Sequence, residues 1–162
     1  MSQLNSYLKI EGARQGPIKG EASEPGHLDD IELTGWSWGM DATTAAYAKG
    51  AVNTSLREMV LHKRTDRATT ALMAALRNNE PLKRVTLTGR KAGGGDTALD
   101  FLKIVLEQAR LTAHSLTATP GSDAYEEVFH LSFLKVSVTY LPQADTGSGA
   151  GATTFETEVT PA

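Results

Sequence analysis

The chain has 162 residues, of which 40% are apolar, and a formal net charge of −3. This length fits one domain with a modest core, and the small acidic excess argues against a nucleic-acid partner, since phosphate binding draws on a basic surface. The absence of cysteine excludes disulfides, thiolate catalysis and cysteine-ligated zinc.

Strand-like segments dominate the chain. Runs rich in Val, Leu, Phe and Thr, bounded by turn residues, predict strands at 4–10, 31–40, 52–62, 84–91, 98–116 and 126–141. One helix is predicted at 66–78, where Asp66 can cap the N-terminus, apolar residues recur at helical spacing and Pro81 follows the end. Segments 93–96 and 119–123 predict hairpin turns. Residues 144–154 predict a Gly-rich flexible linker, followed by a last strand or a tail at 155–159.

No segment is expected to cross a membrane. No run approaches the roughly 20 apolar residues that a bilayer span needs. The N-terminal stretch MSQLNSYLKIEGARQ lacks a basic region followed by an apolar one, so we expect no cleaved signal peptide. If the protein leaves the cell, we expect a route that needs no such signal.

In three of the predicted strands, the apolar residues change between odd and even positions part of the way along the strand. We call this a change of parity. One extra residue, a β-bulge, reverses the side to which later side chains point. Strands that bend repeatedly suit a small, strongly coiled barrel better than a flat sheet. Burial of both faces, first against the core and then against a partner subunit, would give the same pattern. The apolar runs are Ile31, Leu33, then Trp36, Trp38, Met40; Leu102, Ile104, Leu106, then Ala109, Leu111, Ala113; and Phe129, Leu131, Phe133, then Val136, Val138, Tyr140.

Residues 35–39 read GWSWG and fit the G-x-S-x-G pattern of a hydrolase nucleophile elbow. The fold around that elbow needs repeated strand–helix crossovers, whereas this chain predicts one helix. None of the downstream histidines has an evident acid partner in a loop. In a strand, by contrast, Trp36 and Trp38 point to one face and pack together, while Ser37 points to the other face. We therefore expect Ser37 to be structural and the chain not to be an enzyme.

Other motifs predict no cofactor or metal site. The Gly-rich stretch KAGGGD at 91–96 lacks the ending of a phosphate loop, and the four histidines lack metal-ligand spacing. The adjacent acid pairs at 29–30 and 126–127 would point to opposite faces of a strand, so neither pair converges on one substrate. The basic stretch at 57–67 is interpreted as a solvated face, or as half of an electrostatic subunit contact.

The order of several motifs carries a resemblance to a known family. The chain contains LKI at 8–10, IKGE at 18–21, Ser23, His27, DIEL at 30–33, WSWG at 36–39, LT at 87–88 and RKAGG at 90–94. In this order, over about residues 4–142, they resemble the haemolysin-coregulated protein (Hcp) family, which supplies the inner tube of bacterial type VI secretion systems. That fold is similar to phage tail-tube proteins, so a phage-like tail-tube subunit is the alternative, and a Ser37 hydrolase is a second one.

The resemblance implies a mainly β fold: a small β-barrel of two packed antiparallel sheets with one flanking α-helix, which assembles into a hexameric ring. It implies rings that stack into a hollow tube, built in the bacterial cytoplasm inside a contractile sheath, capped by a spike protein and propelled into target cells. It also implies a lumen that can hold and chaperone small effector proteins, with no nucleic acid, cofactor or membrane insertion. Residues 1–142 would form the tube domain, and 143–162 a Gly-rich linker and C-terminal tail.

The resemblance also assigns expected roles to individual residues. Tyr47 and Lys49 would make contacts from an extended loop at 40–51 that reaches the next ring or subunit. Ser37 is the candidate for the lumen wall and for cargo contact, and Trp36 and Trp38 would be core aromatics. The tail TTFETEV at 153–159 lacks the Trp that relatives often carry there, so its packing is left open. No fused toxin domain is expected, so any cargo would be held non-covalently.

Overall fold

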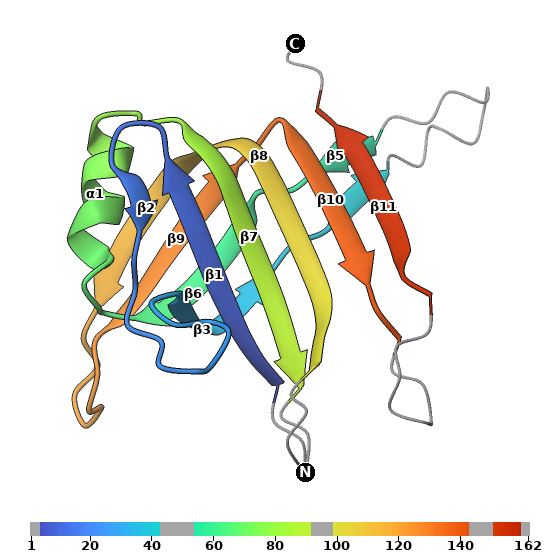
Figure 1. Ribbon diagram of the computed structural model, residues 1–162. Coiled ribbons are helices and arrows are strands. Elements are labelled where there is room, and N and C mark those ends of the chain that lie inside the picture. Colours follow the sequence, from blue (N-terminus) through green and yellow to red (C-terminus); the bar gives the residue numbers. More distant parts are fainter. Residues whose placement is uncertain (1–3, 43–53, 92–98, 143–150, 160–162) are drawn as a thin grey trace.

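The computed structural model describes residues 4–42, 54–91, 99–142 and 151–159 (Figure 1). Tyr47 and Lys49 lie outside these residues, as does the Gly-rich turn at 93–96. The elements in chain order are β1 (Leu4–Gly12), β2 (Gly16–Ile18), β3 (Ile31–Ser37), β4 (Met40–Ala42), β5 (Thr54–Leu56), β6 (Met59–Arg64), α1 (Thr69–Arg77), β7 (Leu82–Lys91), β8 (Leu99–Thr117), β9 (Glu126–Ser132), β10 (Lys135–Tyr140) and β11 (Thr153–Glu158).

Six strands close into a barrel. They follow the order β8-β7-β1-β3-β6-β9, β9 pairs back to β8, and every pairing is antiparallel. Helix α1 lies at one side of the barrel, and β10 and β11 lie at the opposite side (Figure 1). The predicted mainly β barrel with a flanking helix is confirmed. Its two layers belong to one sheet that closes on itself.

The core fills the barrel and the space beneath α1. Alternate residues of each barrel strand point inward, and removing their apolar surface from water stabilises the fold by about 25 cal/mol per Å². The inward residues with no exposed surface include Leu8, Ile31, Leu61, Leu87, Leu106 and Phe129 from the strands, and Leu72 from α1.

Strand β8 bends where the sequence predicts a change of parity. Gln108 has a φ of 51°, in the left-handed region that most side chains avoid, and this residue reverses the alternation. The buried residues on its two sides are Ile104, Leu106, Ala109 and Leu111. In β3 the register shifts between Leu33 and Gly35 in the same way. The parity changes in these two strands therefore mark bends of a closed barrel.

Several predicted strand boundaries were wrong. The predicted strand 31–40 ends at Ser37 as β3, and residues 40–42 form β4, which pairs with β5 in a separate two-stranded ribbon. The predicted strand 52–62 divides between β5 and β6. The predicted strand 126–141 divides into β9 and β10, because these pair with β8 on opposite sides of its bend. Strand β2 was not predicted, since three residues show no detectable alternation.

Helix α1 is shorter than the predicted helix at 66–78. Residues 66–68 form a turn in which the Asp66 carboxylate accepts the backbone N–H of Ala68 at 2.9 Å. The helix begins at Thr69 with Ala68 as its N-cap residue, so Asp66 stabilises the entry turn instead of capping the helix itself. The helix ends at Arg77, and Asn79 follows with a φ of 51°, which stops the helical path before Pro81.

The C-terminal tail forms a strand. β11 pairs along its whole length with β10, and β10 pairs with residues 102–107 of β8. Beyond the bend, residues 110–117 of β8 pair with β9 instead, so the sheet branches at the bend. We call β10 and β11 (residues 135–140 and 153–158) the wing. The sequence left open whether residues 155–159 form a last strand or a tail, and the structure has a strand there, β11.

Candidate assembly and binding surfaces

The wing leaves an apolar face uncovered. In the sheet register Val138 lies between Ile104 of β8 and Phe155 of β11, and Tyr140 lies beside Leu102. These residues share the face that continues the barrel core, because alternate residues of paired strands point to the same side. Even so, Tyr140 is 43% exposed and Phe155 is 44% exposed. The wing therefore presents apolar side chains that no described part of the chain buries.

Strand β11 also presents an open edge. It stands at the end of the strand order, and no other described strand pairs with its outer side. A row of unpaired backbone N–H and C=O groups is a template for pairing with another chain. The wing thus combines an open strand edge with an uncovered apolar face, and both features favour contact with a further protein chain.

The β4–β5 ribbon holds the two ends of the predicted contact loop. The Arg57 guanidinium donates to both carboxylate oxygens of Asp41, at 2.6 and 2.7 Å, and this hydrogen bonding lowers the pKa of Asp41. The Trp38 indole N–H donates to the Arg57 carbonyl at 3.0 Å. Residues 43–53, with Tyr47 and Lys49, lie outside the described residues, so their role in ring stacking stays a prediction.

Ser37 ends β3 with an exposed side chain. Val60 of β6 lies opposite it, and His130 of β9 lies opposite Val60. With strands about 4.8 Å apart, Ser37 and His130 are roughly 10 Å apart, which is too far for proton transfer between them. His130 is therefore not placed to act as a base for Ser37, and the place of Ser37 in a lumen wall stays a prediction.

The two tryptophans lie at the rim of the core. Both are partly buried and pack against the core cluster. The Trp36 indole N–H donates to the Ser6 hydroxyl at 3.2 Å, and the Trp38 ring meets Phe133 edge-on, with centroids 6.2 Å apart. Trp38 follows the end of β3, so the sequence prediction that both belong to one continuous strand was wrong.

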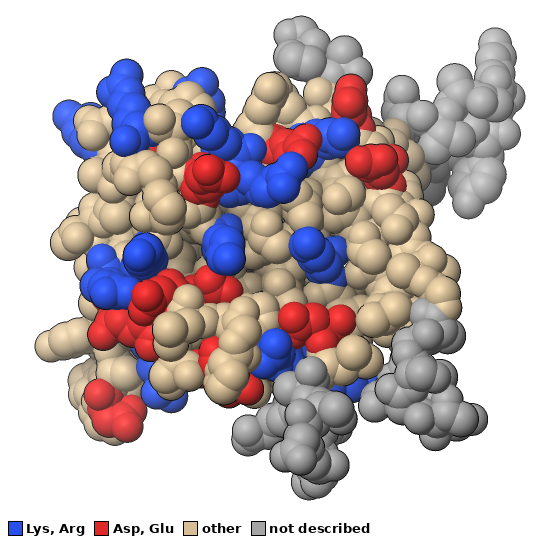
Figure 2. Space-filling model, viewed as in Figure 1, with Lys and Arg blue, Asp and Glu red and all other residues tan. Residues whose placement is uncertain are grey.

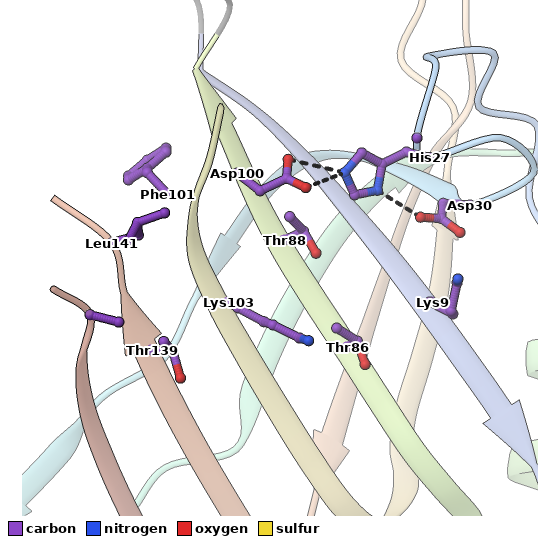
Figure 3. Close-up of a pocket in the computed structure, with 12 residues that line it drawn as sticks. Lys9, His27, Asp30, Thr86, Thr88, Asp100, Phe101, Lys103, Thr139 and Leu141 are labelled. Atoms are coloured by element: carbon purple, nitrogen blue, oxygen red, sulfur yellow. Dashed lines mark hydrogen bonds and ion pairs between the residues drawn. The ribbon is translucent and has the colours of Figure 1, made fainter. Parts of the chain in front are cut away.

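His27 joins the loop before β3 to the front of the barrel (Figure 3). Its Nδ1 atom lies 2.9 Å from the Asp30 carboxylate, and its Nε2 atom lies 3.2 Å from both oxygens of Asp100. The ring stacks on Tyr7 with centroids 4.6 Å apart. Arg90 donates to Asp100 at 2.7 Å. Burial raises the pKa of Asp100, but the hydrogen bonds from Arg90 and His27 outweigh burial and leave that pKa below its usual value.

A buried polar network lies beneath the start of α1. The Lys63 ammonium contacts Asp66 at 2.6 Å and Glu127 at 2.9 Å. The other partners of Glu127 are the Thr69 hydroxyl and the His114 ring, the latter at 3.0 Å. The side chains of Lys63 and Glu127 have no exposed surface. The interpretation of residues 57–67 as a solvated basic face was therefore wrong for Lys63.

The described ranges offer no metal centre and no membrane-spanning helix. Within them, no three His, Cys, Asp or Glu side chains are grouped as a metal ion would require. Their helix is not long and apolar enough to cross a membrane.

Comparisons with known proteins point to one family. The family described as "Type VI secretion system effector, Hcp" matches residues 7–140. Protein hcp1 of Pseudomonas aeruginosa is 30% identical over 151 residues, which cover 91% of this chain and 90% of that protein. The crystal structure of Hcp1 from Salmonella typhimurium matches with a TM-score of 0.75 and 24% identity, covering 98% of this chain and 95% of that one. A type VI secretion system effector from Yersinia pestis matches with a TM-score of 0.74 and 20% identity, covering 95% and 99%.

The closed barrel, its flanking helix and its uncovered wing are the fold of the Hcp structures. The match over residues 7–140 and the relative at 30% identity show the family: the chain belongs to the Hcp family. It is a secreted structural protein of the type VI secretion system, and the phage tail-tube alternative is not favoured.

Proposed function

We propose that six copies of this chain form a ring, and that rings stack into the hollow tube of a type VI secretion system. The tube is assembled in the bacterial cytoplasm inside a contractile sheath, is capped by a spike protein, and leaves the cell without a cleaved signal peptide. Its lumen holds small effector proteins. The chain contributes structure and cargo space to this process and carries out no catalysis.

The uncovered wing carries the assembly part of the proposal. In an isolated chain, Tyr140 and Phe155 keep large apolar surfaces in water, and the outer edge of β11 has no described partner. A neighbouring copy that covers this face would bury both side chains and pair the edge. Contact between the wing of one copy and a different surface of the next is head-to-tail, and such contacts generate rings when the rotation closes.

The face that carries Ser37 suits a lumen wall. Its neighbours across the sheet are Val60, His130, Gly35 and His62, so this part of the face bears small or uncharged groups together with two histidines. A wall of this kind holds cargo without the strong single-sign charge that would restrict it to one class of protein. The tube domain at 1–142, with the extended loop bearing Tyr47 and Lys49, would supply the ring-to-ring contacts.

The solution mass tests the ring. We expect light scattering of the purified chain to give a mass near six times the 17.3 kDa of one chain, with annular particles in negative stain. Tyr140→Asp should place a charge in the covered wing and release folded monomers. Tyr125→Asp is the matched control, since Tyr125 is 63% exposed on the turn between β8 and β9. If the Tyr140→Asp protein still forms the ring, the wing is not part of the interface between copies.

A second experiment separates cargo binding from catalysis at Ser37. We expect a bulky change, Ser37→Trp, to reduce the capture of small co-encoded proteins while the ring mass is kept. We also expect no labelling of Ser37 by a serine-directed phosphonate. Labelling that Ser37→Ala abolishes would contradict the non-enzymatic part of the proposal.

A further inference from the structure

A hollow of about 360 Å³ lies on the front of the barrel, outside the barrel core (Figure 3). Lys9 of β1, Thr86 and Thr88 of β7, and Lys103 of β8 line its floor. In the strand register Lys9 lies opposite Thr86, and Thr88 lies opposite Lys103. The two lysines therefore stand diagonally across β7, with two threonine hydroxyls between them.

The carboxylates at the rim of the hollow already have partners. Asp30 is 2.9 Å from the His27 ring, and Asp100 is held by His27 and by Arg90, the latter at 2.7 Å. The two carboxylates thus make their side-chain hydrogen bonds with His27 and Arg90.

Most cations on the same face are also paired. Arg84 lies 3.2 Å from Glu107, and Lys135 lies between Glu107 at 3.9 Å and Glu156 at 3.4 Å. Figure 2 shows the result as a mixed band of blue and red above the middle of the face, with separate blue side chains among neutral residues below that band.

Lys9 and Lys103 differ from these cations. In the part of the chain that the structure describes, no carboxylate lies within 4.0 Å of either ammonium group. Thr88 is only 8% exposed, so its side chain lies deep in the floor. Two positive charges and two hydroxyl groups therefore face one hollow without a negative group between them.

We propose that this hollow binds an oxyanion, the phosphate or carboxylate group of a ligand, between Lys9 and Lys103. Lysine ammonium groups are donors only, and threonine hydroxyls can donate to the same anion. Hydrogen bonds from a cation to an anionic oxygen are about twice as strong as neutral ones. The rim carboxylates Asp30 and Asp100 repel an extended polyanion, so the site favours a single anionic group. Thr139 of the wing also lines the hollow, whereas Lys9 and Lys103 lie on barrel strands, and the ring and cargo proposals do not rest on these two lysines.

Thermal unfolding of the assembled protein tests the site with inorganic phosphate and, separately, with acetate, against sodium chloride of equal ionic strength. A ligand that binds only the folded state raises the Tm, and at about ten times its Kd we expect a rise of about 3–6 °C. Lys9→Gln and Lys103→Gln should each abolish most of this rise while the ring mass is kept. Lys83→Gln is the matched control, because Lys83 is an exposed lysine on β7 outside the hollow, and it should keep the full rise.

The two anions distinguish the sources of the group. A rise with phosphate alone assigns the site to a phosphate group, and a rise with acetate alone assigns it to a carboxylate, such as an acidic side chain of a partner protein. A rise with both assigns it to either anion. No rise with either anion, or an equal rise in Lys83→Gln, Lys9→Gln and Lys103→Gln, would overturn the proposal and would leave the ring proposal unaffected.

Discussion

The two sides of the barrel differ in how far they are completed within one chain. Beside α1, Lys63 and Glu127 are fully buried, and each has partners inside the fold. In the described residues no buried side-chain N or O atom lacks a hydrogen-bond partner. At the wing on the opposite side (Figure 1), Tyr140 and Phe155 stay exposed beside an open strand edge. The polar groups on the helix side thus have their partners within the chain, whereas the wing keeps an apolar face and a strand edge that another chain can cover.

The largest expected effect comes from breaking the helix side. Lys63→Met removes the cation between Asp66 and Glu127 and leaves the Glu127 carboxylate buried without its ion-pair partner. Breaking one member of a buried pair costs about 3–5 kcal/mol. We expect the free energy of unfolding, measured by chemical denaturation, to fall by that amount.

The double variant Lys63→Met with Glu127→Leu is the control for this prediction. With Glu127 also replaced by an apolar group of similar size, the fully buried carboxylate is gone and only the partly exposed Asp66 loses its partner, so the double variant should be more stable than Lys63→Met alone. A loss below about 1 kcal/mol in Lys63→Met would show that water reaches the network and that this side of the barrel is less closed than its burial indicates.

Removing part of the wing, in contrast to Lys63→Met, is expected to prevent assembly while the fold of the chain persists. Ending the chain after Pro142 removes β11 but none of the buried core cluster, whose last member is Val136. We expect light scattering to show monomers, while far-UV circular dichroism and the cooperative unfolding transition persist. This result would support a tube domain at 1–142. If the truncated chain is unfolded, β11 is needed for folding. The wing would then stabilise the single chain, as the helix side does.

An intermediate effect is expected at Glu80, which is 3% exposed. Burial raises its pKa, but hydrogen bonds from the backbone N–H groups of Gln15 and Arg14 outweigh burial, so the pKa lies below the usual 4.5. A carboxyl whose pKa is lower in the folded state stabilises above its unfolded pKa, and this contribution is lost as the pH falls through the folded pKa.

Glu80→Gln should therefore cost about 1–2 kcal/mol at pH 7, since hydrogen bonds to a charged group are replaced by weaker ones. Below about pH 4 the difference between the variant and the wild type should shrink, as read from denaturation midpoints across the pH range. A difference that stays constant with pH would mean that the charge of Glu80 has no role in holding the turn after β1.

Much of the barrel could be predicted from the alternation of apolar residues. Parity changes in two strands predicted bends, and these occur at Gln108 and between Leu33 and Gly35. The division of 126–141 into β9 and β10 could not be predicted, because the break depends on where β8 bends, and that strand is distant in the sequence. Local periodicity does not report which strand a residue will pair with.

The buried network left a signal that the sequence analysis did not use. Lys63 continues the inward parity of Met59 and Leu61, and Glu127 continues that of Phe129 and Leu131. A charged residue at an inward position of two strands predicts a buried ion pair when the two strands are neighbours. Their pairing, with Lys63 opposite Glu127, became visible only in the fold.

The smallest expected effect lies in the exposed ion pairs that cross from the barrel to the wing. Glu107 of β8 stands between Arg84 of β7 and Lys135 of β10, and Lys135 continues to Glu156 of β11. Side chains in this row are 35–59% exposed, so solvent screens their attraction. Exposed pairs typically contribute about 0.2–1 kcal/mol.

Glu107→Gln should therefore lower the free energy of unfolding by less than about 1 kcal/mol at low ionic strength. The loss should disappear at about 1 M salt, where charges interact over only about 3 Å. The same measurement on Lys63→Met should show little salt dependence, because its network is buried. If Glu107→Gln instead lowers the free energy of unfolding as much as Lys63→Met does, the row of exposed pairs holds the wing to the barrel in the free chain. The wing would then be part of the folded unit before any ring forms.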